Sequence, residues 1–182
     1  TITNNTAGLS GGGIHSFIGA STLNITNALI DGNTASGNAA NQGGGGISLI
    51  NASLSLDATT TISNNIADGT SGSGGGILLV GTGTLTATGT TITGNRANRA
   101  GGGIEDNTGA GLGVTLTNVI LNNNNAGVAP ATGNPGNGGG LHITGAGDIS
   151  ITGGTVNGNT ASLEGGGLWN GTGTMTITGT TI

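Results

Sequence analysis

Residues 74–97 read GGGILLVGTGTLTATGTTITGNRA, and the rest of the chain repeats this unit with variations. Each copy opens with at least three glycines followed by an aliphatic residue: Ile14, Ile47, Ile77, Ile104, Leu141 and Leu168. A second set of aliphatic residues, which recurs every 26 to 35 residues, gives the spacing of the copies: Ile2, Ile30, Ile62, Ile92, Leu121, Val156 and Ile182. A unit of this length that recurs six times predicts a solenoid, in which each unit forms one coil and packs on its neighbours.

Each copy also carries an aliphatic residue with Asn three positions later and Ala two positions after that. The aliphatic and Asn residues pair as Ile2/Asn5, Ile30/Asn33, Ile62/Asn65, Ile92/Asn95, Leu121/Asn124 and Val156/Asn159. We expect the two sets of aliphatic residues, those after the glycines and those before the Asn, to form two columns of the core. We expect the Asn residues to form a ladder of stacked, hydrogen-bonded amides. Local Asx turns are the alternative.

Between these two marks the residues alternate, as in Thr84-Leu85-Thr86-Ala87-Thr88. Period-two alternation predicts a half-buried strand, and Thr, Ile and Val favour strands. The sequence therefore predicts an all-β, right-handed parallel β-helix of about six coils, with three short strands in each coil. Coils should stack at about 4.8 Å, and the glycines should form a tight corner that leaves no room for a Cβ atom.

We expect the whole chain, residues 1–182, to be one solenoid segment. Unit length varies mostly between the Ala and the next glycine run, which predicts loops near residues 36–43, 68–73 and 127–137. The longest loop holds Pro130 and Pro135, which cannot donate to a sheet ladder. The chain begins and ends inside a unit, which we interpret as a piece of a longer polypeptide or a repeating block.

The composition excludes several classes of function. The chain has no Cys, two Arg, no Lys and a net charge of −5, so it lacks the basic cluster of a nucleic-acid-binding protein. No apolar run approaches the roughly 20 residues of a membrane helix, so we expect no membrane insertion by this segment. No motif for a cofactor is present, and we expect none to bind.

The glycine runs, such as Gly74–Ile77, followed by aliphatic-x-x-Asn, such as Ile92 to Asn95, resemble the paired Gly-Gly-Ala-Ile and Phe-x-x-Asn motifs of chlamydial-type polymorphic outer-membrane proteins. More broadly, the chain looks like the β-helix passengers of bacterial surface adhesins and autotransporters. It carries Ile, Leu or Val where that family often has Phe. The resemblance implies an exported bacterial protein, extracellular or on the cell surface, with an adhesive or scaffolding role and a host-surface or glycan ligand.

Polysaccharide lyases share this fold, so a polysaccharide-binding or -cleaving β-helix is an alternative. Such enzymes cluster acidic and basic residues on one sheet. Here the acids fall at different positions of the repeat, and the adjacent Glu105 and Asp106 should point to opposite faces of a strand. Arg96 and Arg99 share a loop without an obvious partner. The sequence therefore predicts a non-catalytic protein.

His15 and His142 occupy the same position in their units, one residue after the aliphatic residue that follows the glycines. This position should point outward, so we expect both to be solvated surface residues. Several coils separate them, which is too far for a shared metal ion. We therefore expect no metal site.

The outward positions of the alternating stretches form runs of Thr. The clearest are Thr84, Thr86 and Thr88, and Thr174, Thr176 and Thr178. A flat Thr array can order water, which makes ice binding an alternative function, although Thr is also common on the solvent face of a sheet. A second hypothesis is end-to-end stacking into filaments, because a β-helix ends in open strand edges.

Overall fold

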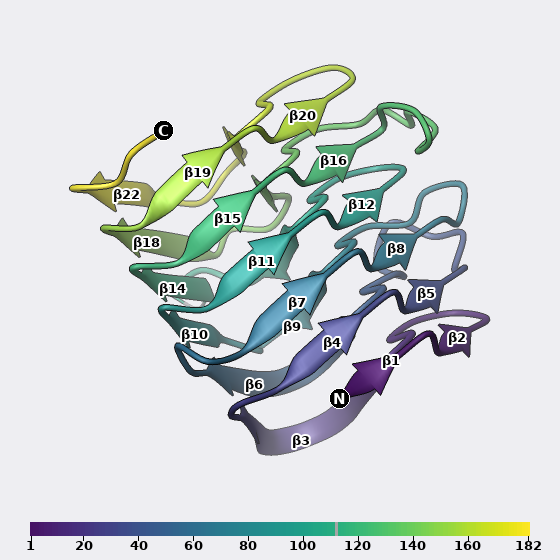
Figure 1. Cartoon of the computed structure of the whole chain (residues 1–182), viewed down its shortest axis with the longest axis horizontal. Coiled ribbons are helices and arrows are strands. Elements are labelled where there is room, and N and C mark those ends of the chain that lie inside the picture. Colours follow the sequence, from purple (N-terminus) through teal and green to yellow (C-terminus); the bar gives the residue numbers. More distant parts are fainter. Residues whose placement is uncertain (112) are drawn as a thin grey trace.

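The computed structural model describes residues 1–111 and 113–182, with the side chains of positions 18 and 20 outside that description. Within this part of the chain all regular structure is β, and every strand pair is parallel. The strands stack in rows that run from the N-terminal to the C-terminal coil (Figure 1). The chain is therefore a β-solenoid of about six coils, as predicted. No helix in the described part is long and apolar enough to cross a membrane.

Three sheets form the sides of the solenoid. The first contains β1 (Ile2–Thr3), β4 (Leu29–Asp31), β7 (Thr61–Ser63), β11 (Thr91–Thr93), β15 (Ile120–Asn122) and β19 (Thr155–Asn157). The second contains β2 (Thr6–Ala7), β5 (Thr34–Ala35), β8 (Ile66–Ala67), β12 (Arg96–Ala97), β16 (Asn125–Ala126) and β20 (Thr160–Ala161). Equivalent residues of successive units lie in register, for example Ile92 with Ile62 and with Leu121.

The third sheet has ten strands. They are β3 (Ile14–Ile25), β6 (Ile47–Leu56), β9 (Ile77–Gly81), β10 (Leu85–Thr88), β13 (Ile104–Thr108), β14 (Gly113–Thr117), β17 (Leu141–Ile143), β18 (Asp148–Thr152), β21 (Leu168–Asn170) and β22 (Met175–Thr178). In the first two coils this side is one long strand. In later coils it divides into two strands, so β6 pairs with both β9 and β10. Three strands per coil thus describes the first two coils, and the later coils have four.

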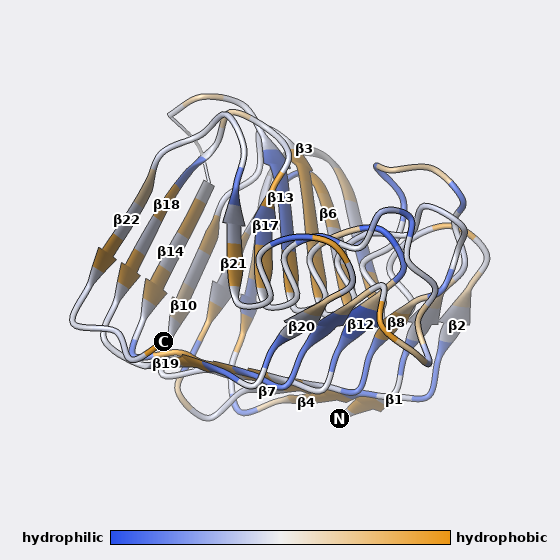
Figure 2. Cartoon of the chain, turned by 90° about the horizontal axis from the view of Figure 1, so that it is seen from above, coloured by the Kyte–Doolittle hydropathy of each residue, from blue (hydrophilic) through white to orange (hydrophobic). Residues whose placement is uncertain are grey.

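The interior is a continuous apolar core. Ile47, Ile77, Ile104 and Leu141 have no exposed surface, while Ile14 and Leu168, in the terminal coils, are partly buried. The second predicted column is buried at Ile30, Ile62, Ile92, Leu121 and Val156, while Ile2, in the first coil, is partly buried. Hydrophobic residues recur as orange bands in the neighbouring strands β10, β14, β18 and β22 (Figure 2). Each coil therefore buries its apolar side against the next, which a single coil could not do.

The glycine corner has a steric cause, which Gly74–Gly76 illustrates. Gly74 has φ of +65°, a left-handed conformation that side chains with a Cβ atom rarely adopt. A Cβ atom on Gly76 would lie 2.6 Å from the Gly103 carbonyl oxygen of the next coil. Backbone amides at this corner donate to the next coil, as from Ile77 to the carbonyl of Gly103. Larger residues would therefore separate the coils here.

A second left-handed position lies just before each ladder Asn. It is occupied in successive coils by Asn4, Gly32, Asn64, Gly94, Asn123 and Gly158, all with φ between +53° and +67°. The residue type alternates strictly between Asn and Gly. A Cβ atom on Gly94 would lie 2.7 Å from Oδ1 of Asn64. Each glycine therefore leaves room for the Asn side chain of the preceding coil.

The predicted loops near residues 36–43, 68–73 and 127–137 lie between the second sheet and the following glycine corner. They leave the stack on one side of the solenoid (Figure 1). Asn98 bonds to two of them: its Nδ2 donates to the carbonyl of Asp68, and its Oδ1 accepts from the amide of Thr132. The loops are thereby tied to the coil between them.

Candidate functional site

The Asn ladder is present at every predicted position: Asn5, Asn33, Asn65, Asn95, Asn124 and Asn159. The side chain of Asn95 shows its geometry. Oδ1 accepts from the backbone amide and from Nδ2 of Asn65, at 3.0 and 2.9 Å. Nδ2 donates to Oδ1 of Asn124 and to the carbonyl of Ile62, both at 3.0 Å. These bonds connect different coils, so the ladder hypothesis is confirmed over local Asx turns.

The ladder satisfies each interior amide completely. An Asn side chain has two donor hydrogens and two acceptor lone pairs, and the side chain of Asn95 uses all four. Asn33, Asn65, Asn95 and Asn124 have no exposed surface. Because a buried amide costs little only when all of its groups are bonded, this column stabilises the stack without an unpaired polar group. Its role is structural.

The outer side of the glycine corner holds a different column, which we call the outer seam. It consists of the residues one position after the aliphatic residue that follows the glycines: His15, Ser48, Leu78, Glu105, His142 and Trp169. Its central members are buried, although they point away from the core. Arg99, in the chain that leads into the glycine run before Glu105, covers the Glu105 carboxylate.

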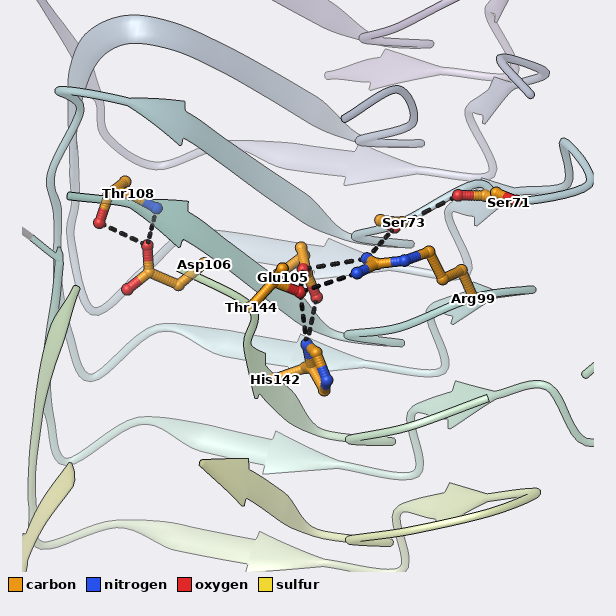
Figure 3. A network of polar contacts seen from close by, with 8 residues as sticks. All are labelled: Ser71, Ser73, Arg99, Glu105, Asp106, Thr108, His142 and Thr144. Atoms are coloured by element: carbon orange, nitrogen blue, oxygen red, sulfur yellow. Dashed lines mark hydrogen bonds and ion pairs between the residues drawn. The ribbon is translucent and has the colours of Figure 1, made fainter. Parts of the chain in front are cut away.

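Glu105 is the centre of a charged cluster in the outer seam (Figure 3). Its Oε1 lies 3.2 Å from Nη1 of Arg99, and its Oε2 lies 2.9 Å from Nδ1 of His142. Thr144 donates its hydroxyl to Oε1 of the same carboxylate. Arg99 also donates from Nη1 to Ser73 Oγ and from Nη2 to Thr144 Oγ1, both at 2.9 Å. Each oxygen of the Glu105 carboxylate therefore has at least one hydrogen-bonding partner.

Glycines of the two neighbouring coils lie beside Arg99 in the stack. The backbone of Arg99 pairs with Gly72 of the coil before and with Gly136 of the coil after. Neither Gly72 nor Gly136 has a side chain, so no side chain at the equivalent position of the adjacent coils occupies the space beside the Arg99 guanidinium. On the far side, the rings of His142 and Trp169 stack at 4.2 Å between centroids and 13° between planes. Trp169 donates from Nε1 to Glu164.

Two expectations from the sequence are wrong here. His142 is only 4 % exposed and bonds to Glu105, whereas His15, in the first coil, is exposed as predicted. Arg99 has partners in Glu105, Ser73 and Thr144. The signal that would have found this cluster is the alignment of units on the glycines: Arg99 precedes Glu105 by six residues, and His142 stands at the Glu105 position of the next unit.

The cluster of Arg99, Glu105, His142 and Thr144, which we call the clasp, is a buried set of polar contacts that connects adjacent coils. Its groups are bonded to one another and largely shielded from solvent. A bonded and desolvated ion pair of this kind resists separation, because removing one partner leaves a buried charge. No group of three or more potential metal ligands lies together in residues 1–111 and 113–182. The cluster can fix the alignment of coils 3 to 5 on the outer side.

Asp106 points to the opposite face from Glu105, as predicted for adjacent strand residues. It lies in the core between Leu79 of β9 and Ile143 of β17 and has no exposed surface. Burial raises the pKa of its carboxyl, and hydrogen bonds from Thr108 oppose this only in part. Alternation along the strand predicted that Asp106 faces away from Glu105 but not that this face is the core.

The predicted Thr face lies on β10 and β22. Thr86, Thr88, Thr174, Thr176 and Thr178 are exposed, and Thr84 is half-buried because its hydroxyl donates to Ser53. The register extends the array across four coils. One column contains Thr86, Thr115, Ser150 and Thr176, and the next contains Thr88, Thr117, Thr152 and Thr178.

One edge of this face is hollowed. A groove of about 630 Å³ is lined by side chains of β10, β14, β18 and β22 together with Gly111, Gly113 and Asp148. Asp148 Oδ1 accepts from the amide of Thr174 at 3.1 Å. The groove therefore offers hydroxyl groups, backbone and one carboxylate.

No family model, curated protein or solved structure matches this chain.

Proposed function

We propose that this chain is a non-catalytic structural segment of an exported bacterial surface protein, in which it forms part of a rigid, adhesive or scaffolding β-solenoid. The resemblance of its glycine and Asn motifs to surface β-helix proteins supports the extracellular location. The continuous Asn ladder and aliphatic columns support the structural role, because they connect every coil to the next along the whole segment.

The observation that carries the proposal is an open apolar column at the last coil. Ile177 of β22 follows Ile151 of β18 in register. Ile151 is 3 % exposed, whereas Ile177 is 42 % exposed. A further coil stacked on β22 would cover Ile177 and continue the parallel ladder. We propose that such a coil comes either from the same polypeptide or from a second copy of this segment.

Electron microscopy of the natural material, together with the mass of its chain, tests this proposal. A layer repeat of about 4.8 Å in a single long chain supports a stalk or adhesin. The same repeat built from short chains supports a filament that assembles by end-to-end stacking. Compact particles that contain only this segment and do not associate would contradict both forms of the proposal.

A matched pair of variants tests the end surface directly. Ile177→Lys places a charge on the open column, and Thr176→Lys places the same charge on the outer face of the same strand. We expect Ile177→Lys to weaken end-to-end association of the isolated segment about tenfold or more, because a Lys cannot be buried there without a partner. Thr176→Lys should leave association nearly unchanged. Equal behaviour of the two variants would exclude β22 as the stacking edge.

The Thr array supports ice binding as a second candidate function. In the last four coils, seven of the eight positions in these two columns are Thr, and neighbouring coils repeat them in register. Hydroxyl and methyl groups spaced by the strand distance of about 4.8 Å present a regular surface to water. Thr117→Tyr would interrupt this surface. If ice binding is the function, thermal hysteresis of the segment should be measurable and should fall several-fold in this variant, while Thr93→Tyr on the first sheet leaves it unchanged. Absence of thermal hysteresis in the unaltered segment would exclude this function.

A further inference from the structure

Strand β13 carries an acid on each of its faces, and the inner one occupies a core position. The column that contains Asp106 consists of Ser16, Leu49, Leu79, Asp106, Ile143 and Asn170. Its polar members at the ends belong to the terminal coils. The three aliphatic members have no exposed surface, and Asp106 lies between two of them with none either. An ionisable group therefore replaces an aliphatic side chain inside the fourth coil.

The bonds of Asp106 suit a neutral carboxyl group. Oδ1 accepts from the amide of Thr108 at 3.1 Å and from its hydroxyl at 2.7 Å. Oδ2 has no partner in the described part of the chain. A buried carboxylate needs donors at both oxygens, and an unpaired buried charge is far costlier than an unpaired neutral group. The site thus favours the protonated acid.

The charged groups around Asp106 act in the same direction. Glu105, on the outer face of the same strand, and Asp148, at the start of β18, both oppose a negative charge on Asp106. The Arg99 guanidinium and the His142 imidazole bond to Glu105 on the outer side. Strand β9 contributes Leu79, and β17 contributes Ile143, on the two sides of the carboxyl. Burial is the largest cause of the raised pKa of Asp106, and these two acids add to it.

We propose that Asp106 makes the fourth coil a proton-dependent opening point, closed while its carboxyl is protonated and loosened from β9 and β17 when the carboxyl ionises. Neighbouring coils hold one another only through their shared faces, so a weakness in one coil divides the solenoid at that coil. The segment is then most rigid in acidic surroundings.

The direction of the pH dependence follows from linkage. The pKa of Asp106 is higher in the folded chain than in the unfolded chain, so the folded state holds the proton more tightly. The corresponding stability is complete below the ordinary carboxyl pKa of 3.8 and is lost as the pH rises through the folded value. Asp57 acts in the opposite sense. Hydrogen bonds from Thr60 and Thr59 lower its pKa, so its contribution is lost as the pH falls.

Thermal unfolding between about pH 4 and about pH 8 tests the proposal. We expect the melting temperature of the unaltered segment to fall by about 5 °C or more over this range. Asp106→Asn, which keeps the acceptor for Thr108 but cannot ionise, should remove most of this fall. Asp68→Asn, which changes an exposed acid of a loop, should retain it. A flat profile in the unaltered segment, or an unchanged fall in Asp106→Asn, would overturn the proposal.

A measurement on the unaltered segment keeps the proposal testable if Asp106→Asn does not fold. The ¹³C resonance of the Asp106 carboxyl reports its protonation directly by NMR, and amide hydrogen exchange reports opening. We expect the carboxyl to titrate above pH 3.8. We also expect amides of β13 and β17 to lose protection about tenfold with rising pH, beyond the intrinsic change, while those of β4 and β7 keep theirs. Titration at the ordinary value, or uniform loss of protection, would refute the assignment.

Discussion

The ladder column and the outer seam run side by side through the same coils, yet they follow opposite rules. In the ladder, one residue type recurs at all six positions and makes the same bonds in each interior coil. In the outer seam, His15, Ser48, Leu78, Glu105, His142 and Trp169 differ in size, charge and polarity. The ladder repeats because each amide must match its two neighbours, whereas a seam residue such as Glu105 is bonded by partners specific to its coils.

This difference shows which parts of a solenoid can vary between coils. A column inside the stack is constrained by identical neighbours above and below, so a change at one coil disturbs three. A seam residue such as Glu105 is bonded mainly by Arg99, His142 and Thr144, and a compensating change in these partners can accommodate a new residue. The residues that differ most from coil to coil are therefore found on the outside of the glycine corner.

The largest effect should come from a charge in the core column. Ile92 has no exposed surface and is flanked by Ile62 and Leu121 in register. We expect Ile92→Asp to cost more than about 4 kcal/mol and to unfold or divide the stack, because the carboxylate would be buried without a partner. Circular dichroism during thermal unfolding measures this, with Thr86→Asp on the exposed face as the control. Unchanged stability in Ile92→Asp would show that the assigned register is wrong.

The next largest effect should come from an interruption of the ladder. Asn95→Ala removes four side-chain hydrogen bonds and leaves buried groups of Asn65 and Asn124 unpaired. We expect a loss of about 3 kcal/mol. Asn5→Ala, at the exposed end of the same column, should cost less than about 1 kcal/mol. Chemical denaturation compares the two variants, and equal losses would mean that burial does not determine the value of a ladder position.

A smaller effect is expected in the outer seam, and it should be reversible by a second change. Arg99→Met leaves the buried Glu105 carboxylate without its guanidinium, which should cost about 2 kcal/mol. Adding Glu105→Leu, the residue of the preceding coil at Leu78, should recover most of this loss. Denaturation of the single and double variants measures the recovery. No recovery would indicate that the clasp is as constrained as the ladder.

The smallest effect concerns the left-handed column in which Asn and Gly alternate. Gly94→Asn should cost about 1 kcal/mol, because its side chain would crowd Oδ1 of Asn64. The exchange Asn64→Gly with Gly94→Asn removes the crowding between positions 64 and 94 but places the new Asn side chain next to Asn123, so it should recover the loss only on the Asn64 side. Melting temperatures of the single and double variants measure this coupling. Additive losses would show that the alternation has no packing cause.

The sequence predicted the solenoid, its two core columns and its Asn ladder because each is a periodic feature, and a period can be read without knowing the contacts. It did not predict the division of the third side into two strands, which begins where Gly81–Gly83 interrupts the alternation in the third coil. It also did not predict the burial of His142. That burial depends on contacts with neighbouring coils, in which His142 bonds to Glu105 and stacks on Trp169.

The candidate site was therefore less predictable than the fold. Glu105 and Asp106 were correctly assigned to opposite faces, but which face is buried depends on the neighbouring coils. Here both are: Arg99 covers the outer face, and Leu79 and Ile143 enclose the inner one. Alternation along a strand predicts one solvent-exposed face and one buried face, so it does not predict a strand on which both acids are buried.

The alternation of Asn and Gly before the ladder gives this solenoid a unit of exchange larger than one coil. If one coil were deleted or duplicated, two Asn side chains or two glycines would meet at the junction, whereas a pair of coils would restore the order from Asn4 to Gly158. Length variants that differ by an even number of coils should therefore fold more stably than those that differ by an odd number. A designer who lengthens or shortens this rod should cut and join it in pairs.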